Sequence, residues 1–180
     1  MRIEYEGEYL NGKRNGKGKE YDYDGKTEFQ IEYINGEKNG KVKEYDYNGR
    51  LKFEGEYLCG KKWNGKGKKY DYKENLVFEG EYINGEKNGK AKEYYNKTLK
   101  YEGDYLMGQR NGIGKEYDYI DGNLIYEGEY LNGKRNGKGK EYDYNGNLKF
   151  ISEYLNGERK EKNIDKEDDS DWELLFNLIY

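Results

Sequence analysis

The stretch "YEGEYLNGKRNGKGKEYDYNGNLK", residues 126–149, decides the fold of this chain. Its first five residues alternate, with two tyrosines and a glycine on one side and two glutamates on the other, which predicts a half-buried β-strand. The following "NGKRNGKG" holds two Asn-Gly pairs and predicts a turn. In "KEYDY" the alternation predicts Tyr142 and Tyr144 on one face, and Glu141 and Asp143 on the other. A further "NG" turns the chain again, so the stretch predicts one β-hairpin.

The same stretch recurs along the whole chain. Successive units begin at an aromatic residue, at spacings of 24, 24, 25, 23, 25 and 24 residues, and a seventh unit ends early after "FISEYLNGERK". Each unit of such an array contacts only its neighbours, so the units line up in one direction. The sequence therefore predicts an all-β fold: an elongated, single-layer antiparallel sheet of tandem hairpins, with about 13 or 14 strands at two strands a unit.

The predicted core of this sheet is built from rings. Only 33% of the residues are apolar, a share typical of disorder, but 23 tyrosines and 5 phenylalanines can bury much surface each. The predicted repeat-core aromatics, two in each unit, are Tyr5, Tyr9, Phe29, Tyr33, Phe53, Tyr57, Phe78, Tyr82, Tyr101, Tyr105, Tyr126, Tyr130, Phe150 and Tyr154. A glycine between the two rings is expected to leave room for an aromatic ring from a neighbouring strand. The second unit has Ile31 and Val42 at two glycine positions, and we expect these side chains to fill one space together.

Composition argues against several classes of function. The net charge is −4 with acids and bases interspersed, which does not suit nucleic-acid binding. The chain has no histidine, which excludes Ser-His and Cys-His catalysis, and its one cysteine can form neither an internal disulfide nor a thiolate cluster. The many glutamates recur at fixed repeat positions, a pattern of a solvated face rather than of a catalytic pair. We predict no enzyme, no cofactor and no metal site.

The expected location is intracellular and cytoplasmic, or within a virion or assembly if the source is a virus. No apolar run approaches the roughly 20 residues of a membrane span, and "MRIEYEGEY" is not a signal peptide. Lysine, asparagine, tyrosine and isoleucine are favoured over alanine and proline, which indicates an AT-rich genome.

The units resemble MORN repeats, whose pattern is an aromatic, x, Gly, x, aromatic, then x-x-Gly and Gly-x-Gly. "YEGEYLNGKRNGKG" matches it throughout at residues 5–18 and 126–139, and the resemblance runs from Tyr5 to about Gly157. Two features depart from the pattern: the second aromatic is tyrosine where the family often has tryptophan, and the usual unit has 24 residues rather than 23. The resemblance implies an elongated sheet of hairpins with a non-enzymatic scaffold or binding role, in protein assembly and sometimes near membranes.

Specificity is expected where a unit breaks the pattern. Trp63 is an extra residue in "LCGKKWNGKG", predicted at a hairpin tip, where its ring would pack back on the sheet or meet a partner. The region 95–99 lacks one residue and its Asn-Gly turn, and Ile120 lengthens the matching turn of the next unit.

The sequence divides into a repeat array over residues 1–163 and an acidic linker with an amphipathic helix over residues 164–180. "SDWE" has the form of a capping box before an apolar run. Trp172, Leu175, Phe176 and Ile179 would share one face of a short helix from about residue 171. This helix would cap the last hairpin, or dock a partner or a second copy.

The favoured function is a non-enzymatic scaffold or adaptor that binds another protein along the sheet or through its ends. The partner-binding candidates are Trp63, Trp172, Leu175, Phe176 and Ile179. The chain could also form homo-oligomers through its sheet edges or its C-terminal helix, whereas no nucleic-acid partner is expected. The alternatives are a carbohydrate-binding aromatic repeat, an anionic-lipid or membrane-associated module, and an antitoxin-like regulator.

Overall fold

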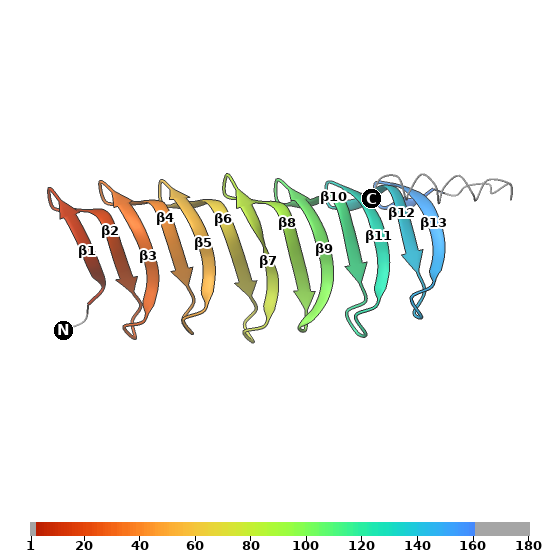
Figure 1. Cartoon of the computed structure of the whole chain (residues 1–180), viewed down its shortest axis with the longest axis horizontal. Coiled ribbons are helices and arrows are strands. Elements are labelled where there is room, and N and C mark those ends of the chain that lie inside the picture. The colour runs from red at the N-terminus through yellow and green to blue at the C-terminus, as the bar shows by residue number, and fades with distance from the viewer. Residues whose placement is uncertain (1–2, 161–180) are drawn as a thin grey trace.

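A computed structural model describes residues 3–160 of the chain, which form one antiparallel sheet whose 14 strands follow each other in chain order (Figure 1). The predicted all-β, single-layer sheet of hairpins is confirmed. The strands are β1 Tyr5–Leu10, β2 Lys13–Tyr21, β3 Thr27–Ile34, β4 Glu37–Tyr45, β5 Leu51–Leu58, β6 Lys61–Tyr70, β7 Leu76–Ile83, β8 Glu86–Tyr95, β9 Thr98–Leu106, β10 Gln109–Tyr117, β11 Leu124–Leu131, β12 Lys134–Tyr142, β13 Leu148–Leu155 and β14 Glu158–Arg159. The predicted C-terminal helix lies outside the described residues.

The turn between the two strands of a unit is shorter than the sequence suggested. Asn132 and Gly133 both have positive φ angles, of 49° and 83°, as a two-residue hairpin turn of the primed type requires. β12 begins directly afterwards at Lys134, so "KRNGKG", predicted as turn, is strand. Its second Asn-Gly pair forms a bulge instead, where Gly137 has a φ of 74° and the register with β11 shifts.

The expectation that tyrosine, phenylalanine and glycine share one face of the sheet, and glutamate, lysine and aspartate the other, was wrong for the second strand of each unit. Tyr126 lies directly opposite Glu141, so the glutamate shares the ring face, whereas Tyr142 lies on the other face and donates its hydroxyl to Glu127 at 3.1 Å. The pairing of Gly128 with Gly139 fixes this register, because a Cβ on Gly139 would meet the Tyr126 ring at 2.5 Å. We call the two sides the ring face and the charged face.

The core is a zigzag of rings along the ring face. The first ring of a unit packs edge-to-face on the second ring of its own unit and on that of the next: Tyr101 lies 5.9 Å from Tyr105 and 5.3 Å from Tyr130, centroid to centroid. Nine of the predicted core aromatics are buried: Tyr33, Phe53, Tyr57, Phe78, Tyr101, Tyr105, Tyr126, Tyr130 and Tyr154. Tyr5, Phe29 and Tyr82 are half-buried. Tyr9 and Phe150, at the two ends of the array, remain 61% and 41% exposed.

Glycine in the first strand makes room for a ring, but this ring is the first ring of the same strand and not, as predicted, one from a neighbouring strand. The Tyr126 ring lies across Gly128 and Gly139, and a Cβ on Gly128 would stand 2.6 Å from the Tyr126 hydroxyl oxygen. In the second unit Ile31 and Val42 pair directly across β3 and β4 and are 4% and 3% exposed. The prediction that these two side chains fill one space together is confirmed.

Trp63 does not lie at a hairpin tip. The tip is the turn at Cys59 and Gly60, and Trp63 is the third residue of β6 and half-buried. Lys62 pairs with Tyr57 of the preceding strand. The carbonyl of Trp63 accepts the Gly85 N–H at 2.8 Å, a bond made elsewhere by the lysine or arginine carbonyl at this repeat position.

The extra residue changes the pairing between β5 and β6. Gly55 pairs with Gly65, whereas the matching Gly7 of the first unit pairs with Gly18, the second glycine of "GKG". Gly65 accordingly has a φ of 152° in place of the values near 76° at the other bulges. The pairing of β6 with β7 keeps the regular register. The bulge therefore absorbs the insertion by a two-residue slide, which leaves every ring on its face.

Candidate interaction surface

One exposed tyrosine in each unit marks the edge of the sheet at which even-numbered strands turn into odd-numbered ones, the lower edge in Figure 1. An exposed ring is informative because large aromatic side chains are usually well covered, and a row of them indicates a binding surface. The row consists of Tyr23, Tyr47, Tyr72, Tyr95, Tyr119 and Tyr144, with exposed fractions of 80, 60, 88, 50, 51 and 80%. We call it the turn tyrosine row. Tyr144, predicted to share a strand face with Tyr142, belongs to it.

An aspartate fixes most of these turns. In the turn at residues 143–147, one carboxylate oxygen of Asp143 accepts the backbone N–H groups of Asn145 and Asn147, both at 2.9 Å. The Asp143 N–H donates in turn to the Asn147 carbonyl at 2.9 Å, and Gly146 takes a φ of 81°. The hydrogen bond from the Asn147 backbone lowers the pKa of Asp143 more than desolvation raises it. The tyrosine after the aspartate is thus held on a well-bonded turn.

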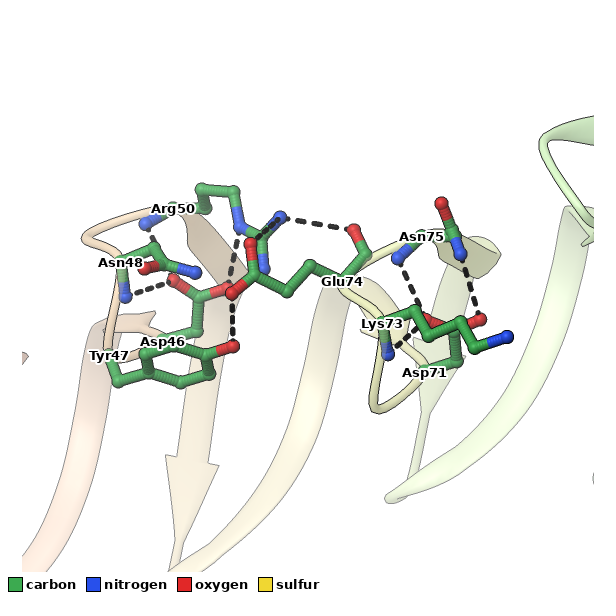
Figure 2. Close-up of polar contacts among 8 residues, drawn as sticks. All are labelled: Asp46, Tyr47, Asn48, Arg50, Asp71, Lys73, Glu74 and Asn75. Carbon is green, nitrogen blue, oxygen red and sulfur yellow. Dashed lines mark hydrogen bonds and ion pairs between the residues drawn. The ribbon is translucent and has the colours of Figure 1, made fainter.

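Neighbouring turns are also linked to each other. Figure 2 shows the turns of the second and third units, in which Arg50 donates to Asp46 at 2.7 Å and to the backbone carbonyl of Glu74 at 3.2 Å. The Tyr47 hydroxyl donates to the Glu74 carboxylate. Glu74 has a φ of 66° where the first and second units have Gly25 and Gly49, so a side chain is retained at a position that glycine usually occupies. The Glu74 carboxylate interacts with two side chains of the preceding turn, the Tyr47 hydroxyl and the Arg50 guanidinium.

The two irregular turns lie next to each other and still present a ring. Asn96 and Lys97 form a two-residue turn with φ angles of 48° and 73°, which joins β8 directly to β9. The Tyr95 ring packs edge-to-face on Tyr119 of the next turn, with centroids 5.2 Å apart. Ile120, the residue that lengthens this next turn, is 79% exposed. These turns give the middle of the row a denser apolar surface.

The charged face is hollowed from β1 to β10. Two shallow troughs, of about 620 and 700 Å³, lie over β5–β10 and over β1–β5, and Glu54 borders both. Their walls alternate in charge; Lys68 and Glu79 form one ion pair across them, at 3.7 Å. Because both signs are present throughout, the troughs carry no strong net field that would select an anionic surface.

The other predicted site residues are separated by the fold. Trp63 lies in β6, and the remaining partner-binding candidates, Trp172, Leu175, Phe176 and Ile179, lie outside the described residues. Within residues 3–160, histidine, cysteine, aspartate and glutamate side chains form no group of three that could hold a metal ion. No helix of that part of the chain has the length and apolarity needed to cross a membrane.

An open sheet in which each hairpin contacts only the next one defines a linear repeat module. Four of its units match the family model of the MORN repeat, at residues 5–27, 78–97, 101–123 and 126–148. The chain is thus a MORN-repeat protein, and proteins of this family are generally non-enzymatic repeat modules. The unit that contains Ile31 and the unit that contains Trp63 lie outside the matched residues. No curated protein matches the chain.

Proposed function

We propose that this chain is a non-enzymatic scaffold that binds a protein partner along the turn tyrosine row. The observation that carries the proposal is the row itself: one exposed ring in each of six successive units, on turns held by hydrogen bonds. Tyrosine is enriched among the residues that dominate protein interfaces, because it offers a large amphipathic surface with few rotatable bonds. A backbone already fixed by the hydrogen bonds of the turn loses little further entropy when a partner binds.

Two other surfaces are less suited to the alternative ligands, a carbohydrate and an anionic lipid. The core rings between the two ends of the array pack edge-to-face on each other and are buried or half-buried, so they offer little free ring plane to a sugar. The charged face has lysine and glutamate in alternation, which does not favour an anionic lipid surface. A carbohydrate ligand would therefore also have to use the turn tyrosine row, and it is an outcome of the test rather than the proposal.

The test compares two double variants in affinity purification from native material followed by mass spectrometry. Tyr72→Ala with Tyr144→Ala removes two of the three most exposed rings of the row, and Ile34→Ala with Ile83→Ala removes two half-exposed side chains near the opposite edge. A protein captured by the wild type and the isoleucine variant, and lost with the tyrosine variant, is the expected result. Equal capture by both variants, or tyrosine-dependent binding to glycans without any protein, contradicts the proposal. Thermal unfolding of both variants checks that the sheet is intact.

A further inference from the structure

The ring face carries an ordered ladder of opposite charges between the units. In four units the second ring donates its hydroxyl to a glutamate of the unit before: Tyr57 to Glu44 at 2.9 Å, and Tyr33, Tyr105 and Tyr154 to Glu20, Glu93 and Glu141. The buried Tyr130 hydroxyl has no hydrogen-bond partner within residues 3–160. A lysine or arginine of the same following unit completes each site, such as Lys62 at 3.1 Å from Glu44. A carboxylate with one tyrosine and one or two cations is the repeating motif.

At one boundary the carboxylate is replaced by a lysine. The third unit reads "GKGKKYDY" where the first and last full units read "GKGKEYDY", and the changed residue is Lys69. Lys69 pairs across the strands with Phe78, as Glu44 pairs with Phe53, so it stands on the ring face at the glutamate position. Along the chain the cations of the ladder before and after it are Lys62, which pairs with Glu44, and Lys87, which Lys69 repels. Three lysines therefore occupy consecutive positions of the ladder, whereas cations and carboxylates alternate at its other positions.

The groups that would bind a carboxylate remain in place around Lys69. Tyr82, half-buried between Phe53 and Phe78, is the tyrosine that should donate to this position, and in the described part of the chain its hydroxyl has no hydrogen-bond acceptor. Lys87 lies 3.7 Å from the Phe78 centroid, and desolvation together with the repulsion from Lys69 lowers its pKa against the attraction of Glu93. No carboxylate within residues 3–160 forms an ion pair with the exposed Lys69.

We infer that Lys69, Lys87 and the hydroxyl of Tyr82 form a binding site for a carboxylate of an acidic segment on a protein partner. The incoming carboxylate would take the position that Glu20, Glu44 and their equivalents occupy at the other boundaries. The ligand class follows from this comparison, because the same tyrosine and cation bind a carboxylate at the neighbouring boundaries. The site is on the ring face and does not depend on the turn tyrosine row.

The test uses a hexaglutamate peptide as the probe and isothermal titration calorimetry at low salt. Lys69→Glu places a carboxylate of the chain itself at this position and should weaken binding of the peptide about tenfold or more. The same variant should raise the thermal unfolding temperature, because cations and carboxylates then alternate along the whole ladder. Lys66→Glu is the matched control: it changes the net charge equally on the charged face of the same strand and should leave binding within about twofold.

Three results would overturn the inference. Equal weakening by both variants would show a non-specific charge effect. Binding of inorganic phosphate with the same dependence on Lys69, without binding of hexaglutamate, would replace the carboxylate by a different anion. Binding that becomes about tenfold tighter when residues 165–180 are deleted would assign the site to the chain's own acidic segment instead of a partner.

Discussion

Replacing Glu44 with glutamine should destabilise the sheet by about 2 kcal/mol. Glu44 is 6% exposed and accepts the Tyr57 hydroxyl at 2.9 Å, Lys52 at 2.9 Å and Lys62 at 3.1 Å. Glutamine can keep the tyrosine bond but only as a neutral one, a loss of about 1 kcal/mol. Each ion pair adds about 0.5 kcal/mol, since both lysine side chains are more than a third exposed.

The pH dependence of stability distinguishes the contribution of the Glu44 charge from that of the shape of its side chain. Burial raises the pKa of Glu44, but hydrogen bonds and attraction from Lys52 and Lys62 outweigh it, and the pKa is lowered. Its contribution is therefore complete above the unfolded-state pKa of about 4.3 and is lost as the pH falls through the lower folded-state pKa. The stability difference between wild type and Glu44→Gln should shrink accordingly in acid.

Urea unfolding followed by circular dichroism measures the difference, and hydrogen exchange of β4 and β5 shows whether the effect is local, as expected for a linear array. The control is Glu56→Gln, an exposed glutamate on the charged side of β5, which should change stability by less than about 0.5 kcal/mol. An equal effect of both variants, or a Glu44→Gln difference that persists unchanged in acid, would refute the reasoning.

Three further outcomes are expected. Gly128→Ala should lose about 2 kcal/mol in thermal unfolding, because its Cβ would stand 2.5 Å from a carbonyl oxygen of the facing strand; a neutral result would contradict the close packing. Replacing Ile31 and Val42 by glycine, singly and together, should show a coupling above about 0.5 kcal/mol in a double-mutant cycle, whereas additive losses would mean that they do not share one space. Asp143→Asn should destabilise the sheet at neutral pH, and by less as the pH falls below about 3.9. The reason is that the hydrogen bond from the Asn147 backbone lowers the pKa of Asp143 in the folded state. A stability difference that does not change with pH would argue against a role for the carboxylate charge.

The repeat pattern was sufficient to predict the fold, because the spacing of rings and glycines repeats seven times. The faces of the second strands could not be read from alternation alone. Both registers of "KEY" give a regular pattern, and the pairing of Gly128 with Gly139 beneath the Tyr126 ring decides between them. Trp63 was misplaced for a similar reason, since "NGKRNGKG" reads as one long turn although its second Asn-Gly pair is a bulge within a strand.

The candidate surfaces were only partly visible in the sequence. The Asp-Tyr-x-Gly turns carry a known signal, an aspartate that binds the backbone two and four residues later, and that signal would have placed Tyr144 outside the strand. The sequence shows that Lys69 replaces the glutamate of the equivalent positions. That this replacement removes a hydrogen-bond acceptor for a tyrosine follows only from the structure, in which Tyr57 donates to Glu44. The roles of Trp63 and of residues 171–180 in partner binding stay predictions.

The exposed rings at the two ends of the zigzag have a consequence for the length of the molecule. Within residues 3–160, Tyr9 has no preceding ring to pack on and Phe150 has no following one, so each end of this part of the chain displays the contact that one more unit would use. A closed barrel fixes its number of strands by geometry, whereas this array contains no closure condition. Its span can therefore grow or shrink by whole units, through gene duplication or deletion, without altering the units that remain.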